Sequence, residues 1–319
     1  MQIKKITLIL SFVLAGLTST AIAQTNDDDY QLVFSDEFDT ADGSQPDSDK
    51  WVRSQRRSST WNRWISDSED VVYIENGCLV LRAIPNPDKE SDPVDMLTGA
   101  VETRDKFAFT YGKVEVRMQV EPFRGSFPAA WMMPQPPAEQ WPKGGEIDIF
   151  ESIDAANTAY HTIHTNWTYN LGNRNKPQSS FSEYVNISQW HTYGLEWTDN
   201  QLTWTVDGRT VGTYKKSTNE EDLELGQWPF DHDFYLILNQ SVGNGSWAAN
   251  AITDHTYVSR VDYVRVYQKV ANSIADNYNK NEKKVNGIYN LKGQKIADNN
   301  SSPAEKGIYI IDGKKTIVK

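Results

Sequence analysis

Apolar and polar residues alternate along many short stretches of the chain, which is the pattern of β-strands that turn one face toward a core. The clearest stretch is 111–120, where four charged or amide side chains alternate with three valines and a methionine. The Asp207-Gly208 pair separates two further stretches of this kind and is a strong signal for a β-hairpin. We find no long amphipathic helical pattern. The chain is therefore predicted to adopt an all-β fold, a β-sandwich or jelly roll.

The first 23 residues have the layout of a secretory signal peptide. Lys4 and Lys5 precede an apolar run over about 6–17, and an Ala-Ile-Ala triplet at 21–23 offers a cleavage site. The run is short for a bilayer span, and no later apolar stretch is long enough to cross a membrane. We expect cleavage after Ala23 and a protein that is secreted or held at the cell surface or in the periplasm.

The C-terminal part of the chain differs from the rest. Residues 270–285 are polar and carry no core pattern, which predicts a linker. In 286–319 a Gly-Ile-Tyr triplet at 287–289 is repeated at 307–309, and we expect a small β tail. This tail resembles the C-terminal sorting modules of exported Bacteroidota proteins, which implies recognition by export machinery. The alternative is a disordered, solubilising tail, and the main domain is expected over 30–269.

Composition narrows the class of protein. The formal net charge is −11, which argues against nucleic acid as a partner, because phosphates require clustered Lys and Arg. Cys78 is the only cysteine, so no internal disulfide can form and a hydrophobic core must hold the fold together. We expect a monomer.

Residues 144–152 read GGEIDIFES and place three carboxylates on one predicted strand. Glu146 and Asp148 are two residues apart, so they share a face. Glu151 comes one residue late, and on a regular strand it would point to the opposite face. A β-bulge at 149–150 would restore the phase and bring Glu151 beside the other two acids. Bulges of this kind re-aim side chains beside active sites.

Three like charges in one row repel each other, which a purely structural strand would avoid. Such repulsion raises the pKa of one carboxyl group, so that it stays protonated while its neighbour is ionised. Cleavage of a glycosidic bond needs this pair, an acid for the leaving oxygen and a carboxylate that attacks or assists. Retention of configuration requires the two groups to lie about 5–5.5 Å apart, which two converging Glu side chains can reach. The alternative is an exposed strand face with ordinary solvated acids.

Further motifs follow one another in order along 30–269. They are FSDEF at 34–38, YGKVEVR at 111–117, FPAAWMMP at 127–134, HTYGLEW at 191–197 and VDYVRVY at 261–267. Together with the acidic strand, this set resembles glycoside hydrolase family 16, in particular its laminarinase-like bacterial members. The resemblance implies an open substrate cleft and no cofactor for catalysis. It also implies that Glu146 is the nucleophile, Glu151 the acid that becomes the base, and Asp148 a hydrogen-bond partner of the nucleophile.

Candidate sugar-binding residues surround this strand in the sequence. Tryptophan rings can stack on the apolar faces of sugars, and Trp131 and Trp141 match cleft positions of the family. His164 matches a histidine that the family places near its catalytic carboxylates. The complete set of candidate substrate-binding residues is Trp131, Trp141, His164, Asn62, Arg104 and Trp247.

Some stretches depart from the family pattern. The segment around Asn62, Phe127 and the stretch 238–247 around Gln240 differ from the usual laminarinase residues, which leaves the polymer open. No spaced ligand set accompanies the histidines, so we predict no zinc site. Many relatives hold a structural calcium ion, for which Glu37 and Asp262 are possible ligands here.

The leading interpretation is a secreted, retaining endo-glycosidase that hydrolyses β-1,3-glucan or mixed-linkage β-1,3/1,4-glucan by double displacement. The same chemistry on a β-galactan-type polymer, such as agar, carrageenan, keratan or mucin glycans, is a rival interpretation. A third is a carbohydrate-binding protein with the same fold and no turnover, although all three acids are present.

Overall fold

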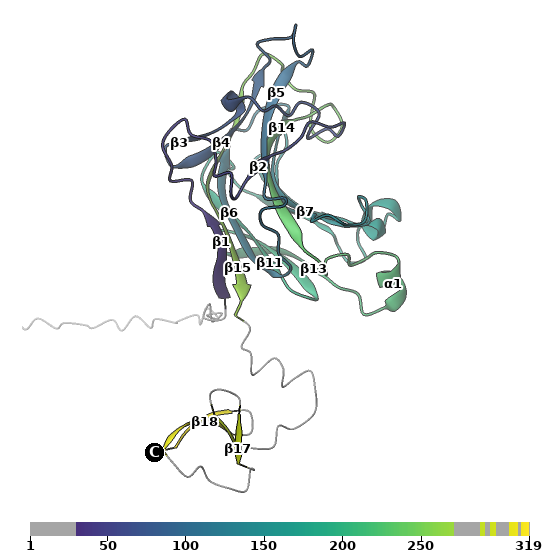
Figure 1. The fold of residues 1–319 in the computed structure, drawn as a ribbon. Coiled ribbons are helices and arrows are strands. Elements are labelled where there is room, and N and C mark those ends of the chain that lie inside the picture. The colour runs from purple at the N-terminus through teal and green to yellow at the C-terminus, as the bar shows by residue number, and fades with distance from the viewer. Residues whose placement is uncertain (1–29, 271–287, 291–293, 298–305, 312–313, 319) are drawn as a thin grey trace, which may run out of the picture.

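The computed structural model describes residues 30–270, 288–290, 294–297, 306–311 and 314–318. The regular secondary structure of these residues is almost entirely antiparallel β, and the strands of residues 30–270 are arranged in two layers (Figure 1). The predicted all-β sandwich is thus confirmed. The predicted signal peptide and all but the first residue of the predicted linker lie outside the described residues.

One layer, called here the outer layer, is built around the long strand β15. In spatial order its main strands are β4 (Cys78–Pro85), β15 (Tyr257–Lys269), β6 (Gly112–Val120), β11 (His191–Trp197), β12 (Gln201–Val206) and β13 (Arg209–Lys215). Two further strands pair at its margin, β1 (Tyr30–Asp36) with β15 and β3 (Val72–Glu75) with β4.

The other layer, called here the cleft layer, carries the acidic strand. Its spatial order is β10 (Ser180–Tyr184), β9 (Thr158–His164), β8 (Glu146–Glu151), β7 (Ser126–Pro134), β14 (Phe234–Val242) and β5 (Met96–Glu102), with β2 (Val52–Arg53) beside β5. Strand β5 pairs with β14 through 99–102 and with β4 through 96–98, so it joins the two layers. The described helical segments are single turns at Glu69–Val71, Asn166–Asn170 and α1 (Glu220–Glu224).

The alternation predicted for 111–120 is present in β6. Its apolar residues Val114, Val116, Met118 and Val120 are buried in the core between the layers, whereas the residues between them are partly exposed. The predicted hairpin joins β12 and β13. Asp207 and Gly208 both have positive φ, 50° and 75°, as the favoured two-residue hairpin turn requires.

The described part of the tail forms a separate antiparallel sheet in the order β17 (Lys295–Ala297), β16 (Ile288–Tyr289), β18 (Gly307–Ile311) and β19 (Lys314–Val318). The repeated Gly-Ile-Tyr triplets contribute to two adjacent strands of this sheet, β16 and β18. A role in sorting stays a prediction. Among the described residues, no helix has the length and apolar character needed to cross a bilayer.

Candidate active site

Strand β8 contains the predicted bulge. Asp148 lies opposite Trp131 of β7, and Phe150 lies opposite Ala130, so Ile149 is an extra residue without a partner across this pair. On the other side, β8 advances three residues from Asp148 to Glu151 while β9 advances only two. The strand therefore changes phase between its second and third acid, as the sequence predicts.

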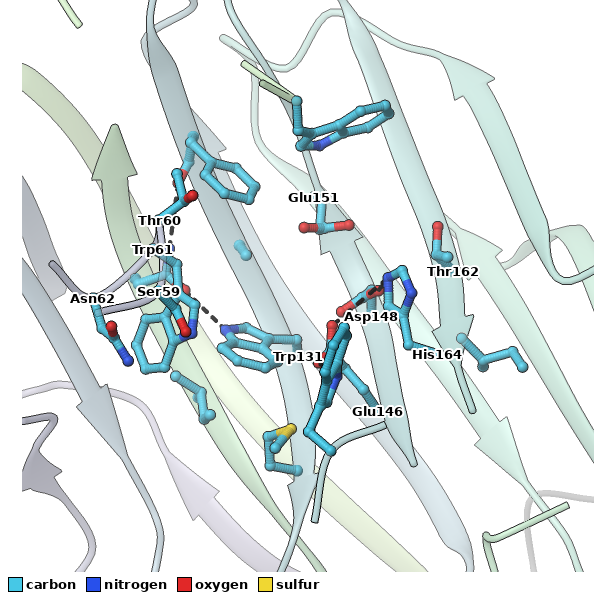
Figure 2. A pocket seen from close by; sticks show the side chains of 18 of the residues that line it. Ser59, Thr60, Trp61, Asn62, Trp131, Glu146, Asp148, Glu151, Thr162 and His164 are labelled. Atoms are coloured by element: carbon cyan, nitrogen blue, oxygen red, sulfur yellow. Dashed lines mark hydrogen bonds and ion pairs between the residues drawn. The ribbon is translucent and has the colours of Figure 1, made fainter. Parts of the chain in front are cut away.

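The phase change sorts the side chains of β8 onto two faces. Ile147, Ile149 and Phe150 are fully buried in the core between the layers. Glu146, Asp148 and Glu151 instead line a cavity of about 910 Å³ on the open face of the cleft layer (Figure 2). The three acids thus meet at one site.

Two buried side chains bind the backbone at the bulge. His161 of β9 contacts the Ile149 carbonyl oxygen through Nδ1 at 2.7 Å. Trp204 of β12 donates its indole N–H to the Asp148 carbonyl oxygen at 2.8 Å. A bulge disrupts the ladder locally, and these partners satisfy carbonyl groups that would otherwise be buried without one.

The tryptophans predicted to bind sugar all line the cavity. Trp131 forms part of its floor, donates its indole N–H to Asn239 Oδ1 at 2.8 Å, and meets the ring of Trp61 edge-on at 5.0 Å. Trp141 and Trp247 are 43% and 49% exposed, so both offer free ring faces to a ligand. Exposed aromatic faces of this kind suit stacking on sugars.

The three polar candidates also line the cavity, in different ways. His164 Nε2 lies 3.5 Å from Asp148 Oδ2 and 3.7 Å from Glu146 Oε1 (Figure 2). Asn62 is only 4% exposed, and its Oδ1 has no hydrogen-bond partner among the described residues. Arg104 forms an ion pair with Glu102.

Comparison with known proteins identifies the family. The model of glycosyl hydrolases family 16 matches residues 60–264. The chain belongs to glycoside hydrolase family 16. As a member of this family it is a glycoside hydrolase, and its β-glucanase relatives and structural neighbours support endo-glycosidase activity.

The relatives of this family 16 enzyme act on different polymers, according to their names. A keratan-sulfate endo-1,4-β-galactosidase of Sphingobacterium multivorum is 37% identical over 79% of the chain, and the match spans 58% of that relative. A β-glucanase of Rhodothermus marinus is 30% identical, with 85% of the chain and 98% of the relative covered.

Solved structures show the same division. The laminarinase from Rhodothermus marinus has a TM-score of 0.66 and 29% identity, covering 76% of this chain and 98% of its own. A structure described under endo-acting O-glycanases of the human gut microbiota, which initiate mucin breakdown, has a TM-score of 0.64 and 27% identity, covering 74% and 98%.

Burial dominates the electrostatics of the acidic site. It raises the pKa of Glu146 to about 8, with a further contribution from the charge of Glu151, and it raises the pKa of Glu151 to about 7. The pKa of Asp148 is also raised, by burial and by both neighbouring carboxylates. The site therefore holds protons at neutral pH.

Hydrogen bonds distinguish the two glutamates. The indole N–H of Trp141 donates to Glu146 Oε2 at 2.6 Å, which favours the ionised form of Glu146. Among the described residues, none donates a hydrogen bond to the Glu151 carboxyl group. His164 does not supply a positive charge at neutral pH, because burial lowers its pKa to about 4.

The two acids predicted as calcium ligands have other partners. Glu37 accepts two hydrogen bonds from Arg265, at 2.8 and 2.7 Å, and Asp262 pairs with Arg117. Calcium needs six to eight oxygen ligands, and these two carboxylates are already neutralised by arginines. With these partners, Glu37 and Asp262 do not fit a calcium cage. Calcium binding by this protein stays a prediction.

The sequence interpretation did not select several residues of the site. Thr162 shares the alternation of His164 on β9 and lines the cavity with it, whereas His161 has the opposite phase and is buried. The two-residue alternation along this strand could have predicted from the sequence which of the side chains of Thr162 and His161 faces the cavity and which is buried. Arg57, which also lines the cavity, carried no such signal.

One departure from the family pattern has no bearing on the ligand. Gln240 does not line the cavity; it is buried, donates to Ser126 Oγ and Ser241 O, and accepts a hydrogen bond from Ser259 Oγ at 2.6 Å. Its role is to connect strands, so the unusual residue at 240 says nothing about the sugar.

Proposed function

We propose that this glycoside hydrolase is a retaining endo-glycosidase that works by double displacement. In the first step the Glu146 carboxylate attacks the anomeric carbon, the glycosidic C–O bond breaks, and Glu151 gives its proton to the leaving oxygen. In the second step Glu151 takes a proton from water, which attacks the same carbon and releases Glu146. The bulge, which brings the third acid to the face of the first two, is the observation that carries this proposal.

The order of the two roles comes from the resemblance to the family. The hydrogen bond from Trp141 supports this order and opposes burial, which raises the pKa of Glu146 above that of Glu151. The nucleophile must be ionised, and Glu146 is the carboxyl group that accepts the Trp141 N–H. The acid must hold a proton, and Glu151 is partly buried with no donor among the described residues to stabilise its anion. Asp148 has a buried Oδ2 that makes no hydrogen bond with the described residues, and its pKa is raised, so it can stay protonated and donate a hydrogen bond to the nucleophile.

For the substrate, we propose a galactose-containing chain of the keratan type. Support comes from the relative that is 37% identical, which is named for this polymer, and from the structure described under mucin O-glycanases. A β-1,3-glucan or mixed-linkage glucan is the second candidate, supported by the Rhodothermus marinus β-glucanase and laminarinase. The signal peptide, a monomeric state and recognition of the tail by export machinery complete the proposal of a secreted or surface-held enzyme.

Digestion of a polymer panel tests the proposal. The purified enzyme is incubated with keratan sulfate, desulfated keratan, mucin glycans, agarose, carrageenan, laminarin, lichenan and barley glucan, and the products are sized. We expect short oligosaccharides from keratan and mucin chains. Products from the glucans alone would contradict the keratan assignment and favour the second candidate.

A matched pair of substitutions tests the mechanism. Glu146→Gln removes the nucleophile with little change in shape, and we expect turnover to fall by roughly a thousandfold or more while glycan binding persists. Glu115→Gln, the same change on β6 of the outer layer, should leave turnover unchanged. Unchanged turnover in Glu146→Gln would contradict the assignment of Glu146 as the nucleophile, whereas glycan binding without turnover in both the wild type and the variant would support a carbohydrate-binding protein.

A further inference from the structure

The positive charges of the cavity lining are not spread evenly. Besides His164, the lining contains three basic residues, Arg57, Arg104 and Arg174. Arg174 acts electrostatically on His164, near the catalytic acids. Arg57 and Arg104 both act on Glu102, at the end of the cleft layer where β5 lies. Two guanidinium groups thus surround one carboxylate at this end, in a chain of net charge −11.

The position of the Arg104 guanidinium is fixed by contacts with a buried acid and an aromatic ring. Its Nη2 lies 2.6 Å from Glu102 Oε1, and Glu102 is only 3% exposed. The Ser54 hydroxyl donates to the other carboxylate oxygen of Glu102 at 3.3 Å. The Arg104 guanidinium also lies over the ring of Tyr235, 6.0 Å from its centroid. A buried acid therefore fixes this guanidinium at the cavity wall, where part of it stays open to a ligand.

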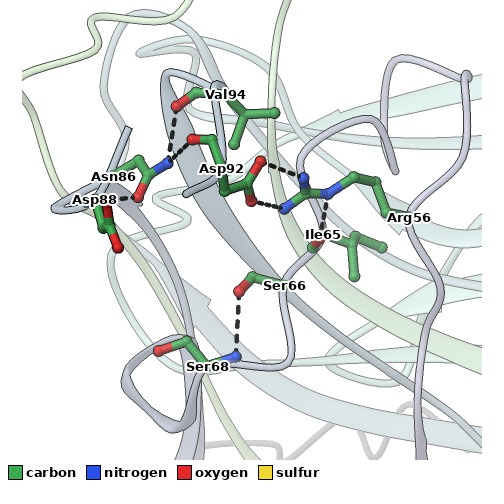
Figure 3. Close-up of polar contacts among 8 residues, drawn as sticks. All are labelled: Arg56, Ile65, Ser66, Ser68, Asn86, Asp88, Asp92 and Val94. Atoms are coloured by element: carbon green, nitrogen blue, oxygen red, sulfur yellow. Dashed lines mark hydrogen bonds and ion pairs between the residues drawn. The ribbon is translucent and has the colours of Figure 1, made fainter. Parts of the chain in front are cut away.

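The segment that carries Arg57 is fixed from outside the cavity. The neighbouring Arg56 binds Asp92 through two hydrogen bonds, at 2.8 and 2.7 Å, and donates to the Ile65 carbonyl oxygen (Figure 3). Arg63 donates to the carbonyl oxygens of Val242 and Gly243 at the end of β14. The backbone around Arg57 is thereby tied at both ends.

Arg57 itself has no such partner. Its side chain makes no hydrogen bond or ion pair with the described residues, and it is exposed at the cavity. Glu102 compensates only one of the two guanidinium groups, so one positive charge is left over for a ligand. Guanidinium groups bind planar or tetrahedral oxyanions through paired, charge-assisted hydrogen bonds.

We propose that Arg57 and Arg104 form a subsite for an anionic substituent of the glycan, a sulfate ester or a sugar carboxylate. This inference rests on the proposed function, because it assigns a substituent to the same cleft. A neutral β-glucan offers no group for these charges, whereas a sulfated or sialylated galactose-containing chain does.

The test compares three forms of one galactose-containing oligosaccharide: neutral, sulfated and sialylated. We expect the wild-type enzyme to cleave at least one anionic form with a kcat/KM roughly tenfold above that of the neutral form, mainly through a lower KM. Raising the salt concentration should shrink this ratio, since the interaction is between charges. Preference for the sulfated or for the sialylated form identifies the source of the anion.

Substitutions test which arginines cause the preference for the anionic substrate. In Arg57→Gln and Arg104→Gln, the ratio of kcat/KM for the anionic form to kcat/KM for the neutral form should fall toward one. Arg260→Gln, on β15 of the outer layer, should leave this ratio unchanged. Because Arg104→Gln leaves Glu102 unpaired, Arg57→Gln is the cleaner variant, and a thermal melt checks that each one folds.

Two results overturn the inference while leaving the proposed function intact. One is equal cleavage of all three forms by the wild type, and the other is a preference that survives Arg57→Gln. Failure to cleave any form would count against the proposed substrate instead.

Discussion

At the scale of single residues, the site depends on one indole N–H as much as on the carboxylates. Trp141 was selected from the sequence for its ring, yet its N–H lies 2.6 Å from Glu146 Oε2 and opposes the effect of burial on that group. A hydrogen bond to an ionised group contributes about 1.5–3 kcal/mol. This contribution favours the ionised form of Glu146 and opposes burial, which raises the pKa of Glu146 to about 8 and that of Glu151 to about 7.

Replacing Trp141 by Phe keeps an aromatic ring and removes this donor. We expect the pKa of Glu146 to rise, so that the acidic limb of the kcat–pH profile moves to higher pH and kcat falls roughly tenfold or more. Trp247→Phe serves as the control, because Trp247 is equally exposed in the cavity and should change KM without moving the limb. A limb that stays in place in Trp141→Phe would refute the assignment of the charge to Glu146.

At the scale of elements, the bulge is the feature that turns a structural strand into a site. Its carbonyl groups are bound from two other strands, by His161 of β9 and Trp204 of β12. These contacts come from the core side of β8, so they fix the backbone without touching the substrate. They act as positioning contacts for the acids on the opposite face.

Two buried tryptophans on neighbouring strands provide a matched test of this role. Trp204 donates to the Asp148 carbonyl oxygen, whereas Trp197 donates to the Phe230 carbonyl oxygen at 3.2 Å. Each change to Phe leaves a buried carbonyl unpaired, at a cost of about 1–3 kcal/mol in the free energy of unfolding. We expect both variants to lose stability, and only Trp204→Phe to lose kcat, by roughly tenfold. Equal kcat in the two variants would show that the bulge needs no support from Trp204.

The sequence predicted those parts of the fold that depend on local pattern. The alternation of apolar and polar residues predicted the buried face of β6, and the Asp207-Gly208 pair predicted a hairpin turn. The break in alternation before Glu151 predicted the bulge. The sequence could not predict which strands are neighbours, because pairing depends on contacts between distant segments. The burial of Gln240 between Ser126 of β7 and Ser259 of β15 follows from such pairing, and so lay beyond the pattern.

At the scale of the whole molecule, the fold carries the cost of three acids withdrawn from water, with Asp148 buried and the two glutamates partly buried. Both glutamates hold a proton more tightly in the folded chain than in the unfolded one, because burial raises their pKa from 4.5 to about 8 and about 7. Their contribution to stability is therefore complete below about pH 4.5 and is lost as the pH rises through 7 and 8. The large core between the two layers must offset this loss.

Thermal melts across pH test this cost. Between pH 6 and 9 we expect the wild type to lose stability, on the order of a few kcal/mol. The double variant Glu146→Gln/Glu151→Gln should lose less over the same range, because its amides do not titrate. If the two melting curves shift in parallel with pH, the acids do not carry the raised pKa values described for the site.

The anomeric configuration of the first product tests the central claim most directly. Carboxyl groups that converge on one sugar, as the bulge in β8 allows, retain the configuration, whereas groups roughly 6.5–9.5 Å apart invert it. The reducing end released from a β-linked oligosaccharide is followed by proton NMR before mutarotation. We predict that the β-anomer appears first; first appearance of the α-anomer would contradict double displacement by Glu146 and Glu151.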